Sequence, residues 1–340
     1  MMDYWVYGLG ISSDVEIPAF GPVRRLPDCE IHFEIGPEPA WVQEVASPPG
    51  EIVYSPALRE RADSTLTITS LLAGKFLEFR YDDGTRFVMN DSTTRLWAAP
   101  GPGLSNEDVF VYLAGPIMGF ALRRRERFAL HASAVLIGEG AVAFCGEPGS
   151  GKSTTAAALA LRGNPVMCED ICPLQNLQDR KHVVPAYPRI GLWPDSARRL
   201  FAAADTLPLI SAGWEKRFLP LDGRLASFAE SPAPLAAIYL LAPRSDTPLA
   251  PCIEPLSQRE SVLALVQNTY MNYLLSKEQR AAEFDTVANL VTEVDCYRVT
   301  PHADPARLGE LAALLETHAV DVMKAMDARS PRIVRADVQP

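Results

Sequence analysis

Short apolar segments separated by turn residues dominate the N-terminal part of the chain. They are rich in β-branched and aromatic residues and alternate in part with polar ones, which is typical of half-buried strands. The sequence Asp82-Asp83-Gly84, between two of these segments, favours a hairpin turn. We interpret residues 1–107 as a β-rich accessory domain. Its strands are expected at residues 4–8, 29–35, 65–72, 76–81 and 85–90.

From residue 108 onward the apolar pattern alternates between helical and strand spacing, which predicts an α/β domain over residues 108–326. Its first helix is expected at 108–127, and the arginines at 123–125 are expected to be a solvated helix end. The tail at 327–340 is charged and is expected to fray. Strands are predicted at 128–137, 141–145, 166–168, 236–241 and 295–299, and helices at 154–162, 196–203, 257–275, 277–293 and 306–318.

A phosphate-binding motif lies between the strand at 141–145 and the helix at 154–162. The sequence GEPGSGKS matches G-x-x-x-x-G-K-[ST], the Walker A pattern, at every fixed position. Glycines let backbone N–H groups wrap a phosphate, Lys152 supplies charge for the β/γ-phosphates, and the Ser153 hydroxyl can ligate Mg²⁺. ATP and Mg²⁺ are therefore the expected cofactors. The predicted nucleotide-binding residues are Gly146, Glu147, Pro148, Gly149, Ser150, Gly151, Lys152, Ser153 and Thr154.

Candidate catalytic side chains flank this motif on both sides. Glu169 and Asp170 end the strand at 166–168, where carboxylates face the nucleotide crevice and can reach Mg²⁺ or accept a proton. They could also be merely a polar strand end. His131 lies in the strand before the loop, where it could orient a carboxylate or approach a phosphate. The alternative for His131 is a structural role near the core.

Three cations further along the chain are candidate substrate or phosphate contacts. Arg189 could bind either ligand or form a structural ion pair, and the adjacent Lys216 and Arg217 could reach transferred phosphoryl charge or be inert surface residues. Cys168, Cys172 and His182 could be imagined as zinc ligands, but no fourth ligand has suitable spacing.

Composition and charge exclude some classes of binding partner. The chain has 340 residues, 48% hydrophobic content and a net charge of −10, so a nucleic-acid partner is not expected. The first residues have neither a cationic segment nor an apolar core typical of a signal peptide. The longest apolar stretch, 109–122, is interrupted by Gly115-Pro116 and is too short to cross a bilayer. We expect a cytoplasmic protein without a membrane partner, in which the scattered cysteines are reduced thiols.

Together these residues resemble the catalytic domain of the HPr kinase/phosphorylase family. The resemblance rests on Leu130-His131-Ala-Ser-Ala-Val, the strand entering GEPGSGKST, the helix ending at Gly163 and the acidic pair one strand later. It implies a P-loop nucleotide domain whose fold is similar to that of PEP carboxykinase. It also implies the activity of the HPr kinase family, which uses ATP and Mg²⁺ to phosphorylate a serine hydroxyl. It also places His131 at the family's histidine before the loop and Ser153 at the metal site.

The same resemblance places Glu169 where the family's catalytic-base aspartate stands and Asp170 at the metal-associated acid. Because glutamate replaces aspartate at the first position, which acid is the base stays open.

The chain departs from the HPr kinases proper downstream, because it lacks a segment resembling EMRGLGIIN, and its N-terminal part also looks different. It looks more like the HPr-kinase-like enzymes of ribosomal peptide pathways, including lasso-peptide kinases, in which segments similar to PRIGLWPDS and KRFLPL recur. The resemblance thus predicts an ATP- and Mg²⁺-dependent serine kinase acting on a peptide or small protein, with the C-terminal serine of a lasso precursor peptide as the expected acceptor. A homo-oligomer is compatible with this interpretation.

Three alternatives remain beside this prediction. One is an HPr-type protein serine kinase/phosphorylase. Another is a nucleotide-gated binding module that transfers no phosphate. The third is a small-molecule kinase or a carboxykinase-like enzyme, although the carboxykinase's extra metal ligands are not found.

Overall fold

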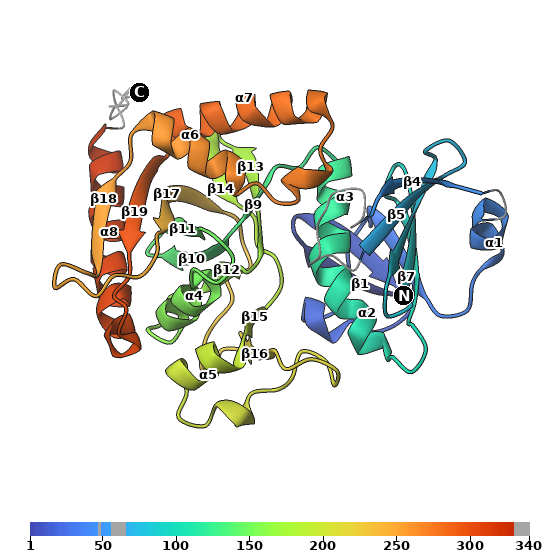
Figure 1. Cartoon of the computed structure of the whole chain (residues 1–340), viewed down its shortest axis with the longest axis horizontal. Helices are drawn as coiled ribbons and strands as arrows, with labels where there is room; N and C mark the ends of the chain where they lie inside the picture. Colours follow the sequence, from blue (N-terminus) through green and yellow to red (C-terminus); the bar gives the residue numbers. More distant parts are fainter. Residues whose placement is uncertain (47–48, 56–65, 330–340) are drawn as a thin grey trace, which may run out of the picture.

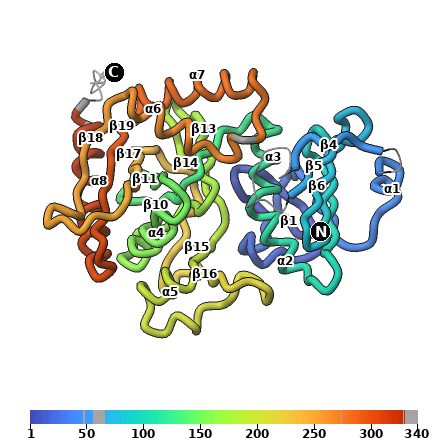
Figure 2. The backbone as a smooth tube through the Cα atoms, in the orientation of Figure 1, coloured from blue at the N-terminus to red at the C-terminus, as the bar shows by residue number. Residues whose placement is uncertain are grey.

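Two large β-sheets form the body of the protein (Figure 1). The computed structural model describes residues 1–46, 49–55 and 66–329. Helix α2 (Asn106–Tyr112) contacts the first sheet and α3 (Met118–Arg124) contacts the second. The N-terminus lies beside the first sheet, and the last helix, α8 (Leu308–Arg329), runs along the opposite side of the molecule (Figure 2). The fold is therefore mixed α/β, as the sequence predicts.

The first sheet has eight strands in the order β1-β2-β3-β8-β7-β6-β5-β4. The β2–β3 and β3–β8 pairs are parallel and the others are antiparallel. The predicted hairpin around residues 82–84 is confirmed as the β6–β7 turn, whereas β2, β4, β8 and helix α1 (Ala40–Ala46) were not predicted. The strands are β1 (Met2–Val6), β2 (Leu9–Ser13), β3 (Ile31–Ile35), β4 (Glu51–Tyr54), β5 (Leu66–Leu71), β6 (Phe76–Tyr81), β7 (Arg86–Asn90) and β8 (Arg95–Ala99).

The second sheet has nine strands built around the long buried strand β17 (Ala233–Leu241). Strands β11 (Gly140–Cys145) and β19 (Asp295–Thr300) run parallel to β17 on its two sides. The remaining strands are β9 (Ala129–His131), β10 (Ser133–Ile137), β12 (Val166–Cys168), β13 (Ile171–Leu177), β14 (Arg180–Val183) and β18 (Cys252–Pro255). A separate two-stranded sheet pairs β15 (Arg189–Leu192) with β16 (Arg217–Pro220).

The helices of this part are α4 (Lys152–Ala160), α5 (Pro194–Leu200), α6 (Gln258–Gln267) and α7 (Lys277–Glu293), together with α8. Helices α4 and α8 contact each other and both pack on the second sheet. One buried hydrophobic cluster continues from the first sheet through α2 and α3 into the second sheet. The boundary at residue 107 stays a prediction.

The predicted strand at 128–137 is wrong as a single strand. It breaks at Ala132, because β9 pairs with β13 whereas β10 pairs with β11 and β12. The chain changes partners at this point, which a single apolar run cannot reveal. The break places His131 at the end of β9.

The predicted helix at 108–127 is also interrupted. A π-helical segment, Leu113–Ile117, separates α2 from α3. Within it, Gly115 has non-helical backbone torsions, with φ of −98° and ψ of −105°. Pro116 cannot donate a backbone hydrogen bond, so the regular helix cannot continue through it. The bend therefore follows from the Gly-Pro pair.

Several predicted ends differ from the structure. The helix expected at 257–275 stops at Gln267, and Met271 takes a left-handed conformation before a short 3₁₀ turn. The helix expected at 306–318 begins at Leu308 and continues to Arg329, so residues 327–329 are helical rather than frayed. The rest of the predicted tail, 330–340, lies outside the described residues.

The prediction of a solvated arginine end is wrong for two of its three residues. Arg123 donates to the carbonyl of Tyr270 and pairs with Glu283 of α7. Arg125 donates to the backbone and side chain of Glu30. Arg123 and Arg125 are therefore bound by residues from distant segments of the chain.

Within the described ranges, no helix combines the length and apolar character that a membrane span requires.

Candidate functional site

The predicted phosphate loop connects the buried strand β11 to helix α4. Gly146, Gly149 and Gly151 have φ values of +144°, +80° and +105°, which residues with side chains rarely adopt. A Cβ on Gly146 would also lie 2.8 Å from the carbonyl oxygen of Leu241. The backbone N–H of Gly146 donates to Asn268 Oδ1 at 2.9 Å. These glycines therefore allow a tight loop, which Asn268 holds from the end of α6.

Lys152 begins α4 and folds back over the loop. Its Nζ donates to the carbonyls of Gly146 at 2.7 Å and Glu147 at 3.3 Å, and the residue is 8% exposed. Burial lowers the pKa of the ammonium group. Within the described residues, the buried hydroxyl of Ser150 has no hydrogen-bond partner. A buried polar group of this kind calls for a partner, and a phosphate oxygen in the loop would supply one.

Glu169 lies next to the start of α4. Ser153 Oγ donates to Glu169 Oε1 at 2.7 Å, and Lys216 Nζ lies 3.8 Å from the same oxygen. The residue is 6% exposed, so its carboxylate is held between a hydroxyl and an ammonium group. The residue predicted to ligate Mg²⁺, Ser153, therefore contacts Glu169.

Asp170 faces a different set of groups. His131 Nδ1 lies 3.2 Å from Asp170 Oδ1, and the Tyr270 hydroxyl donates to Asp170 Oδ2 at 3.3 Å. Burial lowers the pKa of His131, so its ring is neutral at neutral pH and can donate one N–H to the carboxylate. Because the Asp170 side chain is 37% exposed, a hydroxyl can approach it.

The two acids therefore have distinct surroundings. The sequence resemblance associates Asp170 with the metal and Glu169 with the base, whereas Ser153 contacts Glu169, and His131 and Tyr270 contact Asp170. Sequence reasoning missed Tyr270 and Asn268. Both follow the apolar run of α6, and the pairing of Leu130 with Thr269 helps bring this segment to the site.

Two cavities meet at the acid pair. The phosphate-side cavity, of about 390 Å³, is lined by the loop, by Ser153 and Thr154, and by the cations Lys152, Arg199 and Arg244. The second, also about 390 Å³, has mainly apolar walls and is called the apolar cavity below. The two share Glu169, Asp170, Gly191 and Lys216. The acids therefore form a boundary that can be reached from both sides.

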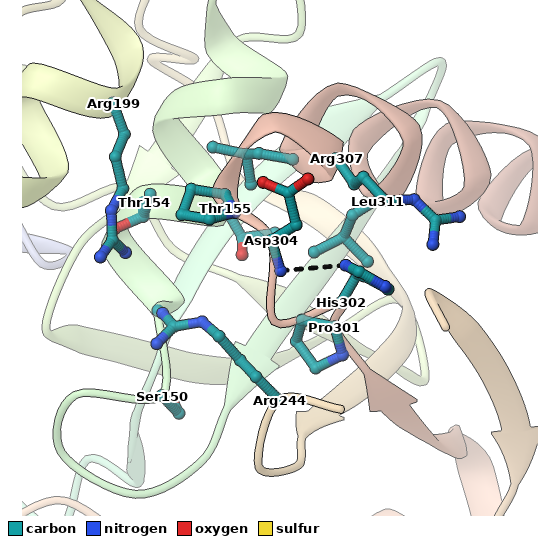
Figure 3. Close-up of a pocket in the computed structure, with 13 residues that line it drawn as sticks. Ser150, Thr154, Thr155, Arg199, Arg244, Pro301, His302, Asp304, Arg307 and Leu311 are labelled. Atoms are coloured by element: carbon teal, nitrogen blue, oxygen red, sulfur yellow. Dashed lines mark hydrogen bonds between the residues drawn. The ribbon is translucent and has the colours of Figure 1, made fainter. Parts of the chain in front are cut away.

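Two arginines that the sequence analysis did not single out border the phosphate loop. Arg199 of α5 and Arg244, which follows β17, extend toward the region beside Thr154 from different sides (Figure 3). In the part of the chain that the structure describes, neither guanidinium makes a hydrogen bond or ion pair. Thr154 itself donates to Ser196 Oγ at 2.9 Å. Arg244 stands three residues after the end of β17, and it reaches the loop because β17 pairs with β11, which the sequence alone does not show.

The three later candidate cations separate in space. Arg189 lines the apolar cavity, with its guanidinium carbon 4.1 Å from the centre of the Phe218 ring. Lys216 lies at the boundary between the cavities. Arg217 donates to the carbonyls of Asp205 and Leu207 and is not among the described residues that line either cavity. The structure thus brings Lys216, but not Arg217, to the acids.

The oxygen groups present fit Mg²⁺ better than zinc. Ser153 and Glu169 offer a hydroxyl and a carboxylate, and Mg²⁺ commonly takes few protein ligands and completes its shell with phosphates and water. Within the described ranges, no group of three or more His, Cys, Asp or Glu could hold a metal. Cys168, Cys172 and His182 therefore do not form the imagined zinc site.

Comparison with known proteins adds little to what the contacts of the site show about function. No model of a protein family matches the chain, and no curated protein matches it. Among solved structures, the HPr(Ser) kinase/phosphatase from Coxiella burnetii is similar at 16% identity, over 59% of this chain and 93% of that one, with a TM-score of 0.33. A TM-score this low does not support a functional conclusion.

Proposed function

We propose that this chain is an ATP- and Mg²⁺-dependent kinase that phosphorylates a serine hydroxyl of a peptide or small protein. The acceptor we favour is the C-terminal serine of a ribosomal precursor peptide, which rests on the sequence resemblance described above. The observation that carries the proposal is the acid pair at the boundary of two cavities. Its Glu169 contacts the serine of the phosphate motif, and its Asp170 is exposed to the second cavity.

The donor side has the groups that phosphoryl transfer requires. Backbone amides of residues 146–153 and the ammonium group of Lys152 would bind the phosphates, with Arg199 and Arg244 beside them. Ser153 and Glu169 would hold Mg²⁺, which when bound would neutralise charge on the phosphates. Lys216, near Glu169, can stabilise charge that develops on the transferred group.

On the acceptor side, Asp170 would accept the proton of the serine hydroxyl. As the acceptor oxygen bonds to the γ-phosphorus, the bond from that phosphorus to the β,γ-bridging oxygen breaks and ADP leaves. The proton stays on the Asp170 carboxyl until solvent removes it. His131 and Tyr270 each hold one oxygen of this carboxylate and thereby orient it.

The first test is phosphorylation of serine-ending synthetic peptides by the full-length protein with ATP and Mg²⁺, followed by mass spectrometry. We expect a gain of one phosphoryl group, and a loss of at least about 100-fold in rate for Lys152→Ala. Glu169→Gln and Asp170→Asn are run beside it. If ATP binds saturably and no peptide gains phosphate, the kinase proposal is wrong and the nucleotide-gated binding module is favoured.

A further inference from the structure

The apolar cavity contains a cation whose role the contacts of the folded chain do not explain. Arg189 begins β15, and its guanidinium lies over the Phe218 ring at 4.1 Å. Across the described residues the guanidinium forms no hydrogen bond or ion pair, although Glu107 lines the same cavity. Burial lowers the pKa of Arg189, which reflects the cost of removing this charge from water. An anion in the cavity would offset that cost.

The triphosphate is not the anion that this position favours. Arg189 does not line the phosphate-side cavity, which already contains Lys152, Arg199 and Arg244. Arg189 lies on the other side of the acid pair, where the acceptor would enter, and it also borders a third cavity that does not include the acids. Its ligand should therefore belong to the acceptor and remain close to the reacting hydroxyl.

We infer that Arg189 binds the C-terminal carboxylate of an acceptor peptide whose last residue is the phosphorylated serine. This inference rests on the proposed function. The planar guanidinium of arginine matches a carboxylate with two parallel hydrogen bonds, which an ammonium group cannot reproduce. Stacking on Phe218 fixes the plane of that group. A C-terminal serine carries its hydroxyl and its carboxylate on one residue, and Asp170 and Arg189, which line the same cavity, would each engage one of these groups.

The walls of the cavity define the rest of the ligand. Phe110 and Val111 of α2 line the cavity together with Leu209, Ile210 and Trp214. A volume of about 390 Å³ accommodates several residues rather than a single amino acid. We therefore expect small or apolar residues immediately before the terminal serine.

The test measures binding without nucleotide, so that it does not depend on phosphoryl transfer. Full-length protein is mixed with pooled acetylated tetrapeptides that end in serine after three positions drawn from Ala, Val, Leu and Phe. One pool ends in a free carboxylate and the other in a carboxamide. Retained peptides are identified by mass spectrometry, and the best pair is titrated by calorimetry, with N-acetylserine as a small carboxylate.

We expect the carboxylate to bind at least about tenfold more tightly than the carboxamide. Arg189→Gln should reduce this preference to about twofold or less while leaving carboxamide affinity unchanged, which also demonstrates that the variant is folded. Arg189→Lys should be intermediate. Arg224→Gln is the matched control, because Arg224 is exposed and lines neither cavity within the described residues, and it should behave like the unmodified protein.

Equal affinity for the two pools, a preference that survives Arg189→Gln, retention of neither pool, or N-acetylserine binding as tightly as the tetrapeptides would each overturn the inference. The kinase proposal can fail separately. Carboxylate-dependent binding without phosphorylation would contradict the kinase function and leave the Arg189 site intact. Equal phosphorylation of both pools would support a kinase and reject the carboxylate site.

Discussion

The phosphate-side cavity and the apolar cavity share Glu169, Asp170, Gly191 and Lys216, but different kinds of segments build them. Six residues that line the phosphate side come from one short stretch, residues 148–154, which leads from the loop into α4. The apolar side combines residues 18–19, 107–116, 169–170, 187–191 and 208–218. A local motif can thus form one half of a site, whereas the other half requires the whole fold.

The difference also separates the two acids. Glu169 is held by Ser153 and Lys216, whereas Asp170 is held by His131 and Tyr270. Consecutive residues can face different partners because Asp170 has a left-handed backbone, with φ of 68°. Their chemical roles should therefore be separable by mutation.

The largest expected effect comes from Asp170→Asn. Loss of the proposed base should lower kcat for peptide phosphorylation by about 10²–10⁴-fold, with little change in ATP affinity. Glu169→Gln should instead raise the Mg²⁺ concentration that gives half-maximal activity, because Glu169 contacts Ser153. Steady-state kinetics over a Mg²⁺ series distinguishes them. The opposite pattern would restore the assignment implied by the family resemblance.

Gly146→Ala should damage the phosphate side selectively. Its Cβ would meet the Leu241 carbonyl at 2.8 Å in addition to the strain of positive φ, so we expect about 1–3 kcal/mol less stability and weaker ATP binding. Gly149→Ala is the matched control, because φ is also positive there but, among the described residues beyond its chain neighbours, no atom would lie within 4 Å of the added Cβ. Denaturant unfolding and ATP titration measure both variants. Equal losses would show that the strain of positive φ alone, and not the close approach to Leu241, explains the effect of Gly146→Ala.

Gly191→Ala should affect both cavities through Lys216. The added Cβ would lie 2.7 Å from Lys216 Cε and 2.8 Å from its Nζ, so the flexible side chain must move away. Its contact with Glu169 would be lost, and we expect phosphorylation to fall by about 2–10-fold, the range of one modest polar interaction. Lys216→Met provides the comparison. If Gly191→Ala lowers the rate further in a Lys216→Met background, another cause must act.

The smallest expected effect is a pH dependence of stability from His131. Burial lowers its pKa below 6.5, so on acidification the unfolded chain takes up this proton before the folded chain does. The contribution of His131 is therefore lost as the pH falls below about 6.5. His131→Gln should reduce the decrease in unfolding free energy between about pH 7.5 and about pH 5.5. His318, whose pKa is also lowered by burial, remains in both proteins, and an unchanged pH profile would contradict the expected role of His131.

Sequence patterns predicted local elements better than their partners. The hairpin at residues 82–84, the strand at 141–145 and the helix at 277–293 depend on turn residues, an apolar run and helix-forming residues close together in the chain. The strand at 128–137 and the helix at 108–127 fail where the chain changes partners at Ala132 or bends at Gly115-Pro116. The prediction that Arg123 and Arg125 are solvated is wrong for the same reason, since the residues that they contact are distant in sequence.

The sequence by itself determined the geometry of the loop at residues 146–153, because glycines that allow positive φ, a lysine and a hydroxyl stand there at fixed short spacing. It also brought Glu169 and Asp170 near that loop, since a short strand carries them there directly after α4. Only the tertiary structure decided which acid faces Ser153 and which faces His131 and Tyr270. Only it separated Arg189 from Arg217 and assembled the apolar cavity, because those contacts join segments that no local pattern links.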